Sequence, residues 1–479
     1  MSAKIHYYDI GDYLSREDKL NIIKKFGSIA HIPWTIIEPN EHGDWINHRN
    51  EMFKKFIPIE PEKKFKKGEK SFFETYAIGV ATNRDAWVYN FSSKAISDNM
   101  QRMICFYNEQ RAAYTEAIKE SPLLNVEDFI NQDSTKISWT RSLRNDIQKA
   151  KTHQYKDDAL RIGNYRPFQK QNLYFSASFN EAIGLSPKFF PTPDHKNMVI
   201  CVSCVSCNNG LSLLITNCIP DLHYIGDTQY FPLYWYEEKS MPQKHSDGST
   251  DSRDMFETIM KEKEYLRRDG VTDWILEAAR NLYGYKVTRE DIFYYVYGIL
   301  HSPDYRTIFA TDLKKSLPRL PLVEKADDFW AFSKAGRELA ELHINYETIE
   351  PYQKCQVVYA PLTTKGEGMN YRVEKMRFAK KDSKTADKSI IHYNAGITIE
   401  NIPAEAYEYI VNGKSATEWI MERYAVTTDK KSGITNDPND WAKEHEDEKY
   451  ILNLLLRIIN VSVQTVEIVK GLPKLKFEE

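Results

Sequence analysis

Residues 284–321, GYKVTREDIFYYVYGILHSPDYRTIFATDLKKSLPRLP, predict two consecutive helices around which the rest of the chain is organised. Thr288 and Asp291 form a capping-box start for the first helix, and Ser302 with Pro303 starts the second, because Ser caps and Pro fits the first helical position. Apolar residues then recur at helical spacing. They are Ile292, Tyr295, Val296, Ile299 and Leu300 in the first helix, and Tyr305, Ile308, Phe309 and Leu313 in the second.

We call residues 284–321 the hub, and basic residues occur within it and in the segment that follows its second helix. Pro318 and Pro321 predict an extended exit that carries Arg319 between them. Display of Arg319 on this rigid backbone favours ligand recognition, and capping of the preceding helix is the alternative. We expect four basic side chains to point outward: Arg306, Lys314, Lys315 and Arg319.

Length and charge restrict the classes of function. A chain of 479 residues has room for two or three domains with large cores. Its net charge of −3 means that any DNA-binding surface is a local patch. The uncharged run Met198–Pro220 contains the turn Asn208-Asn209-Gly210, so we interpret it as a core β-hairpin and not a membrane span. Six cysteines without a secretory leader indicate a cytoplasmic protein.

The order of helix and strand signals predicts a mixed α/β (α+β), multidomain fold. A mixed-sheet recognition domain is flanked by helical segments and by a second β region. The expected parts are residues 1–121, which end in a long connecting helix at Ser93–Lys119; 122–240, the mixed sheet; 241–350, the helical hub; and 351–479, the second β region with C-terminal helices.

Several shorter segments are assigned on local pattern alone. We expect helices at Asp44–Phe56, Arg253–Arg268 and Pro403–Val411, and a strand at Ala86–Phe91. Residues 239–252 should form a polar connection.

Five stretches together resemble one family, the C-terminal coupler and specificity region of Type ISP restriction-modification enzymes. They are the hub, Thr82-Asn83-Arg84-Asp85-Ala86-Trp87-Val88-Tyr89-Asn90, Tyr165-Arg166-Pro167-Phe168, Phe231-Pro232-Leu233-Tyr234, and Asn412-Gly413-Lys414-Ser415 through Asn436-Asp437-Pro438-Asn439-Asp440. The resemblance implies that residues 1–121 are a coupler-like segment that includes the tail end of a methyltransferase domain, after its catalytic motifs. It also implies sequence-specific recognition of double-stranded DNA by a target-recognition domain, as part of phage defence.

The chemistry of such enzymes is missing from this chain. An adenine methyltransferase needs an Asn/Asp-Pro-Pro-aromatic motif, and the sequence has no Pro-Pro pair. Gly413-Lys414-Ser415 lacks the earlier glycine of a Walker phosphate loop. We therefore expect no cofactor here and no enzyme activity of the chain alone. By the resemblance, S-adenosylmethionine, ATP and Mg²⁺ belong to methyltransferase and helicase/nuclease domains of the same system.

Two rival functions stay open. Asp194 with Glu237-Glu238-Lys239 mimics the loose pattern of a metal-dependent nuclease, but this pattern often occurs by chance, the resemblance places the nuclease in another domain, and a turn and a strand end are the ordinary explanation. The second rival is a scaffold that only holds the other parts of a phage-defence complex.

The candidate DNA contacts are chosen from basic and amide residues near these motifs. They are Asn83, Arg84, Arg141, Arg144, Lys149, Arg166, Lys170 and Arg319. For Arg84 the alternative is an Arg–Asp pair that fixes a loop, and for Arg166 it is core anchoring through Tyr165 and Phe168. The lysine-rich segment 54–70 is either a solvated loop or a phosphate contact.

Cys201, Cys204, Cys207 and Cys218 offer a possible zinc site. Valines between the first three favour a strand and a core role over metal ligation.

Overall fold

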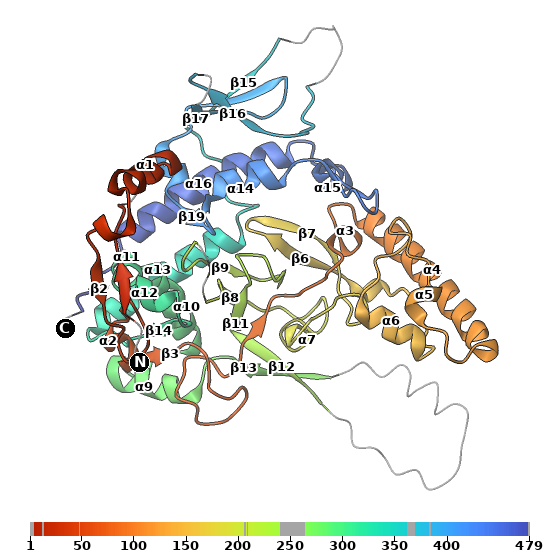
Figure 1. Cartoon of the computed structure of the whole chain (residues 1–479), viewed down its shortest axis with the longest axis horizontal. Helices are drawn as coiled ribbons and strands as arrows, with labels where there is room; N and C mark the ends of the chain where they lie inside the picture. Colours follow the sequence, from red (N-terminus) through yellow and green to blue (C-terminus); the bar gives the residue numbers. More distant parts are fainter. Residues whose placement is uncertain are drawn as a thin grey trace.

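The computed structural model describes residues 4–11, 14–46, 48–205, 207, 209–239, 264–361, 369–382 and 385–477. Helices and several small sheets alternate along the chain, so the predicted mixed α/β class is confirmed (Figure 1). The connection 240–252 and turn residue Asn208 lie outside the described residues. Two apolar cores each join segments from both sides of the expected boundaries at residues 121 and 240.

The first predicted helix of the hub forms, but the second is divided at Phe309 into two short helices, and Ile308 is 42% exposed instead of lying on a buried face. Helix α10 (Arg289–Leu300) begins at a capping box made by Thr288 and Asp291, and α11 (Pro303–Ile308) begins at Ser302. Helices α9 (Asp273–Tyr283), α12 (Ala310–Leu313) and α13 (Ala326–Ile344) complete the helical region. A Cβ on Gly298 of α10 would lie 2.1 Å from the carbonyl oxygen of Phe332 in α13. The backbones of α10 and α13 therefore approach closely only because glycine occupies this crossing.

Three of the four hub cations do not point freely outward, contrary to the expectation. Arg306 donates to the Leu211 carbonyl at 2.6 Å, and Lys315 pairs with Asp44 at 2.8 Å. Arg319 donates to the carbonyls of Phe56 and Lys54, at the end of α2 (Glu51–Lys55). Because helix ends leave carbonyls without intrahelical partners, Arg319 caps α2 rather than the helix before it. Lys314 is exposed.

Two four-stranded sheets form the centre of the molecule. One has the order β4-β11-β8-β9 and the other β10-β6-β7-β5, with β10 parallel to β6. Strands β8 and β9, the predicted hairpin, are completely buried, which explains their uninterrupted apolar sequence. The bounds are β4 Ala77–Ile78, β5 Tyr89–Asn90, β6 Leu160–Arg166, β7 Gln169–Tyr174, β8 Val199–Val202, β9 Leu213–Thr216, β10 Ile219–Pro220 and β11 Gln229–Pro232.

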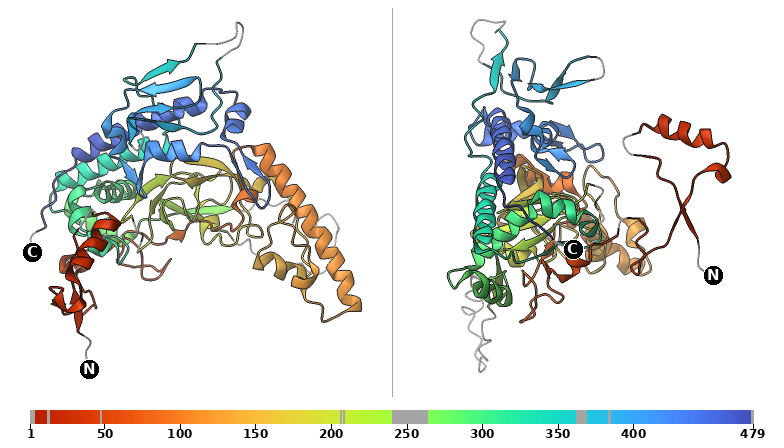
Figure 2. Two further views of the ribbon diagram at one scale, coloured as in Figure 1. Left: turned by 45° about the horizontal axis from the view of Figure 1, so that its top comes forward. Right: turned by 90° about the vertical axis from the view of Figure 1, so that its left-hand side faces the viewer.

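A helical arm extends from this centre. Helix α4 (Ser93–Glu120) buries one apolar face at its start and projects beyond the sheets together with α5 (Val126–Phe129) and α6 (Arg141–Gln148) (Figure 2). The short helices η2 (Asp157–Ala159) and α7 (Ser186–Phe189) lie in the loops around the sheets.

The C-terminal part places a third four-stranded sheet, β15-β18-β17-β16, above helices α14 and α16 (Figure 1). Helix α16 is long and apolar enough to cross a membrane by composition, but it packs against α13 and α14 and buries most of its apolar residues. The bounds are β15 Gln356–Tyr359, β16 Arg377–Lys380, β17 Ala386–His392, β18 Ile397–Glu400, η3 Ala404–Tyr407, β19 Ile410–Val411, β20 Lys414–Ser415, α14 Ala416–Arg423, β21 Thr427–Thr428, β22 Thr435–Asn436, α15 Pro438–Glu444 and α16 Tyr450–Lys470.

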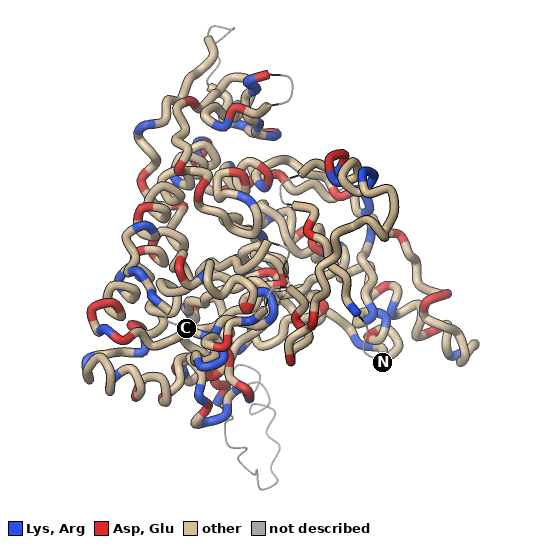
Figure 3. Tube along the Cα trace, turned by 60° about the vertical axis from the view of Figure 1, so that its left-hand side comes forward, with Lys and Arg blue, Asp and Glu red and all other residues tan. Residues whose placement is uncertain are grey.

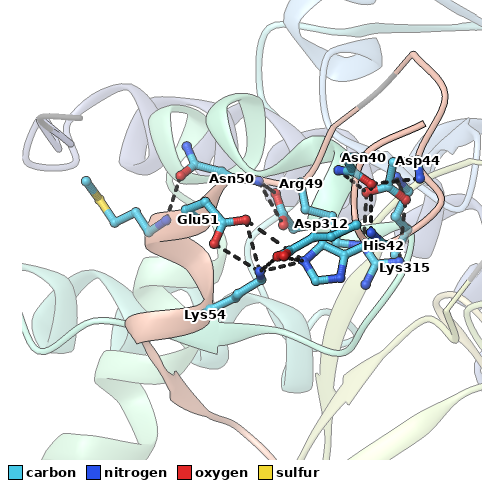
Figure 4. Close-up of polar contacts among 11 residues, drawn as sticks. Asn40, His42, Asp44, Arg49, Asn50, Glu51, Lys54, Asp312 and Lys315 are labelled. Carbon is cyan, nitrogen blue, oxygen red and sulfur yellow. Dashed lines mark hydrogen bonds and ion pairs between the residues drawn. The ribbon is translucent and has the colours of Figure 1, made fainter. Parts of the chain in front are cut away.

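The N-terminal segment stands apart from the body (Figure 2). It contains β1 (Ile5–Tyr7), α1 (Arg16–Phe26), η1 (Ile29–His31) and β2 (Thr35–Ile37), and no residue of α1 is buried. Its attachment includes polar contacts (Figure 4): the backbone N–H of Asn50 donates to the Asp312 carboxylate, and the hydrogen bond from Lys315 lowers the pKa of Asp44 to about 2. Strand β3 (Ile57–Pro58) then pairs with β14 (Arg319–Leu320), far along the sequence.

Four local predictions are wrong, wholly or in part. Residues 86–91 form the end of helix α3 (Asp85–Val88) and then β5, not one strand. Tyr265–Asp269 is strand β13, paired with β12 (Tyr234–Glu238), so the described end of the expected helix 253–268 is extended. Among the described residues of Asp44–Phe56, only 51–55 are helical, and Pro403–Val411 contains the short helix η3 followed by strand β19.

Candidate nucleic-acid interface

A largely buried polar network joins two of the segments singled out from sequence, Thr82–Asn90 and Tyr165–Phe168, to Asp221. The Tyr165 hydroxyl donates to the Asp85 carboxylate at 2.8 Å, and Thr82 also donates to Asp85. Arg166 donates to Asp221 at 2.8 Å and lies over the ring of Tyr165. The network therefore fixes the turn before α3 and the loop after β10 against strand β6.

Burial shapes the charges of this network. The Asp221 side chain is almost completely buried, which raises its pKa to about 6 although Arg166 acts in the opposite direction. Arg84 is 4% exposed and donates to the Thr140 hydroxyl at 2.6 Å, and burial lowers its pKa to about 10. Among the four residues Thr82–Asp85, only Asn83 is exposed, at a left-handed φ of 53°.

Two other candidate contacts are also engaged within the protein. Lys170 forms a half-buried ion pair with Glu347 at 2.6 Å, and Arg319 caps α2. Their side chains, like those of Arg84 and Arg166, hold the fold in this structure. Contact of these four residues with DNA stays a prediction.

Helix α6 and its C-cap residue Lys149 carry two of the exposed candidate contacts. Leu143 and Ile147 are buried under it, while Arg141 and Lys149 are exposed on the opposite side. Arg144 is half-buried, with its Nε 3.7 Å from a Glu127 carboxylate oxygen. Arg141 and Lys149 are therefore placed where a DNA backbone can approach.

The lysine-rich loop before β4 is also at the surface. Lys64 lies over the Tyr76 ring at 3.7 Å and Lys66 pairs with Glu69, whereas Lys63 and Lys67 are exposed. Basic and acidic residues alternate along much of the trace (Figure 3). A polyanion would therefore meet local basic clusters on this structure and not a uniformly basic face.

One basic cluster was missed by the sequence reasoning. It lies on and beside the edge strand β16, and its exposed members are Lys375, Arg377, Lys380 and Lys381. The signal was present as a dense run of Lys and Arg after residue 371. Charged residues also protect sheet edges from unwanted pairing, so this cluster alone does not assign a function.

The nuclease and zinc candidates are not assembled into metal sites. Glu237 pairs with Arg268 at 2.8 Å, and Asp194 lies exposed in a separate loop. Within the described residues, the group that could hold a metal by distance is Glu41, His42 and Glu51, and the Lys54 ammonium already lies among these side chains (Figure 4). Cys201 is buried in β8, and Cys204 and Cys207 have their sulfur atoms 3.0 Å apart.

Comparison with known proteins shows which class of protein this chain belongs to: it is a specificity domain of a restriction-modification enzyme. The sequence profile of the Type ISP C-terminal specificity domain matches residues 71–454. The chain belongs to this family, and the resemblance inferred from sequence is confirmed. No curated protein sequence matches the chain.

Solved structures, among them those of two Type ISP restriction-modification enzymes, share the fold over 99% of this chain. A nuclease-deletion mutant of LlaGI in complex with a DNA substrate mimic is 37% identical with a TM-score of 0.79, and DNA-bound LlaBIII is 33% identical with a TM-score of 0.80. The DrdV–DNA complex is 28% identical with a TM-score of 0.79. Each match covers 99% of this chain but only 40%, 28% and 44% of those longer chains, respectively.

Proposed function

We propose that this chain recognises a specific sequence in double-stranded DNA and presents it to the catalytic domains of a Type ISP restriction-modification system. The observation that carries the proposal is the shared fold over 99% of the chain with DNA-bound LlaGI and LlaBIII. Exposed cations on α6 and on β16 supply local positive charge for the DNA backbone.

The partners of the chain are proposed as methyltransferase and helicase/nuclease domains in the cytoplasm. The N-terminal segment supports a protein partner, because it exposes large apolar side chains: Leu20 is 54% exposed, Ile23 53% and Trp45 56%. Exposed apolar clusters mark protein–protein contacts. S-adenosylmethionine, ATP and Mg²⁺ would be bound by those partner domains.

A selection from random DNA duplexes tests the proposal. The full chain is used to enrich bound duplexes, and the affinity for the enriched site is compared with that for a shuffled site over a range of salt concentrations. We expect a preference for one sequence and an affinity that falls as salt rises. Equal retention of both duplexes would contradict recognition, and cleavage of plasmid with Mg²⁺ by the chain alone would favour the nuclease rival.

A further inference from the structure

A cavity of about 290 Å³ lies between α3, the β6–β7 hairpin, the end of α14 and the β21–β22 hairpin. Its wall includes Asp85, Tyr165 and Gln169 from the segments already described, and Arg423, Thr427 and Asn436 from the C-terminal part. It therefore lies at the junction of the recognition motifs, although no motif by itself predicts it.

Two buried polar side chains in the cavity wall have unused hydrogen-bonding capacity. In the part of the chain that the structure describes, Gln169 Oε1 and the Tyr89 hydroxyl have no hydrogen-bond partner, and both residues are 2% exposed. The Gln169 amide nitrogen donates to the Arg423 carbonyl at 3.0 Å, which fixes the amide so that Oε1 remains a free acceptor. Buried polar atoms normally have partners, so each of these two atoms keeps a hydrogen-bonding capacity that the fold does not use.

The wall has the chemistry of a site for a flat polar ring. Tyr89 is 2% exposed and its ring lies 4.7 Å from the Tyr165 ring, which Arg166 covers on one side, so these residues form a packed aromatic lining rather than an open stacking surface. The Asp85 carboxylate already accepts from Tyr165 and Thr82, and the Arg423 guanidinium pairs with the wall residue Glu422 at 2.9 Å. Gln169 Oε1 is an acceptor without a partner among the described residues. A nucleobase offers a π-face together with amine donors and ring acceptors. The volume is near the lower end of the roughly 300–1,000 Å³ of small-molecule pockets, which fits one base.

Positive charge lies beside this cavity. The tip of the β21–β22 hairpin carries Lys430 and Lys431, both exposed, directly after the wall residue Asp429. The Ser134 hydroxyl donates to the Lys431 carbonyl at 2.8 Å and so ties the tip to the helical arm. Two exposed ammonium groups at this position suit the phosphates on either side of a base that leaves the stack.

We propose that this cavity binds one unstacked nucleobase of the bound duplex. The inference rests on the proposed function, and it adds a binding site to it. The base enters between the β6–β7 and β21–β22 hairpins, and Gln169 Oε1 accepts a hydrogen bond from its amine.

The experiment uses the full chain and duplexes of the selected site that carry 2-aminopurine at one position at a time. This fluorescent base brightens when it leaves the stack. We expect a fluorescence increase at one position only. A bulky ring at the cavity wall, Thr427→Phe, should abolish the increase, and Gln169→Met should weaken binding of the site about tenfold, the cost of one hydrogen bond. Thr435→Phe is the matched control on the same hairpin, because Thr435 is not part of the wall.

A second arm measures binding of adenosine, cytidine, guanosine and thymidine to the chain by NMR. One outcome is that a nucleoside binds the wild type but not Thr427→Phe, while 2-aminopurine brightens at no duplex position. The cavity then binds a free base and not a base of the duplex, and the proposal is overturned. If the duplex is retained selectively while no position brightens and no nucleoside binds, the cavity proposal fails and the proposed function stands. If no duplex is retained selectively, the proposed function fails, and the cavity proposal that rests on it fails as well.

Discussion

The Arg166 guanidinium donates to the Asp221 carboxylate at 2.8 Å, 55 residues apart in sequence, and both side chains are largely shielded from water. This pair ties strand β6 to the loop that follows β10. Arg166 was chosen from sequence as a DNA contact, and in this structure it positions the segments that surround the candidate interface.

Replacing Arg166 by Ala should destabilise the fold. Removal of one partner of a buried ion pair leaves the other charge unpaired, which costs about 3–5 kcal/mol. The loss in the free energy of unfolding should be measured by urea denaturation at pH 8, where Asp221 is ionised. At pH 5 the loss should be smaller, because Asp221 can take up a proton. A loss below about 1 kcal/mol at pH 8 would contradict the structural role.

The raised pKa of Asp221 predicts a pH dependence of stability. In the unfolded chain this carboxyl titrates near 3.8, and in the fold burial raises its pKa to about 6. The protonated form is thus favoured by folding. Its contribution is complete below pH 4 and is lost as pH rises to 6, by roughly 3 kcal/mol. Urea denaturation of the wild type and Asp221→Asn from pH 4 to 8 should show this loss in the wild type alone. Parallel curves would contradict it.

The crossing of α10 and α13 should tolerate no added methyl group. A Cβ at Gly336 would lie 1.9 Å from the carbonyl oxygen of Tyr294. Gly336→Ala and Gly298→Ala should each cost about 1–3 kcal/mol or more through overpacking, measured by thermal unfolding. Gly396→Ala is the control, because its Cβ would meet only an ordinary contact at 3.7 Å. Equal effects at all three positions would rule out the close approach as the cause.

Charge reversal on α6 should weaken DNA binding without unfolding the chain. Arg141→Glu and Lys149→Glu each remove an exposed cation, and each should lower the slope of log affinity against log salt by about 1 if it contacts a phosphate. Lys334→Glu on α13 is the matched control, since this lysine is 78% exposed on another helix. Fluorescence anisotropy with the selected duplex measures the slopes. Unchanged slopes for both α6 variants would remove α6 from the interface.

Local signals in the sequence were sufficient for most helices. The capping box at Thr288, the start of α11 at Ser302 and Pro303, and the long helix α4 are determined by neighbouring residues. Strand β13 was mistaken for the end of a helix because its own residues favour a helix, and pairing with β12 overrides that preference. The run at 86–91 is too short for its apolar pattern to distinguish helix from strand.

The candidate interface was harder to predict than the fold. Arginine and lysine residues are visible in the sequence, but their acidic partners are distant: Glu347 lies 177 residues after Lys170. Whether such a cation faces DNA or a carboxylate depends on tertiary contacts that no local pattern encodes. The cavity beside Gln169 is likewise made by three segments that meet only in the folded chain.

Contacts between N-terminal and C-terminal segments also determine at what stage of its synthesis this protein can fold. The Phe91 amide donates to Asn436, 345 residues later, and helix α16 completes the core that contains Trp87 and Tyr89. A ribosome that adds about 5–20 residues per second needs on the order of 20–70 s to make that stretch. During this time the unfinished sheets expose apolar edges, so a nascent chain interrupted before Asn436 is a natural client for chaperones and proteases.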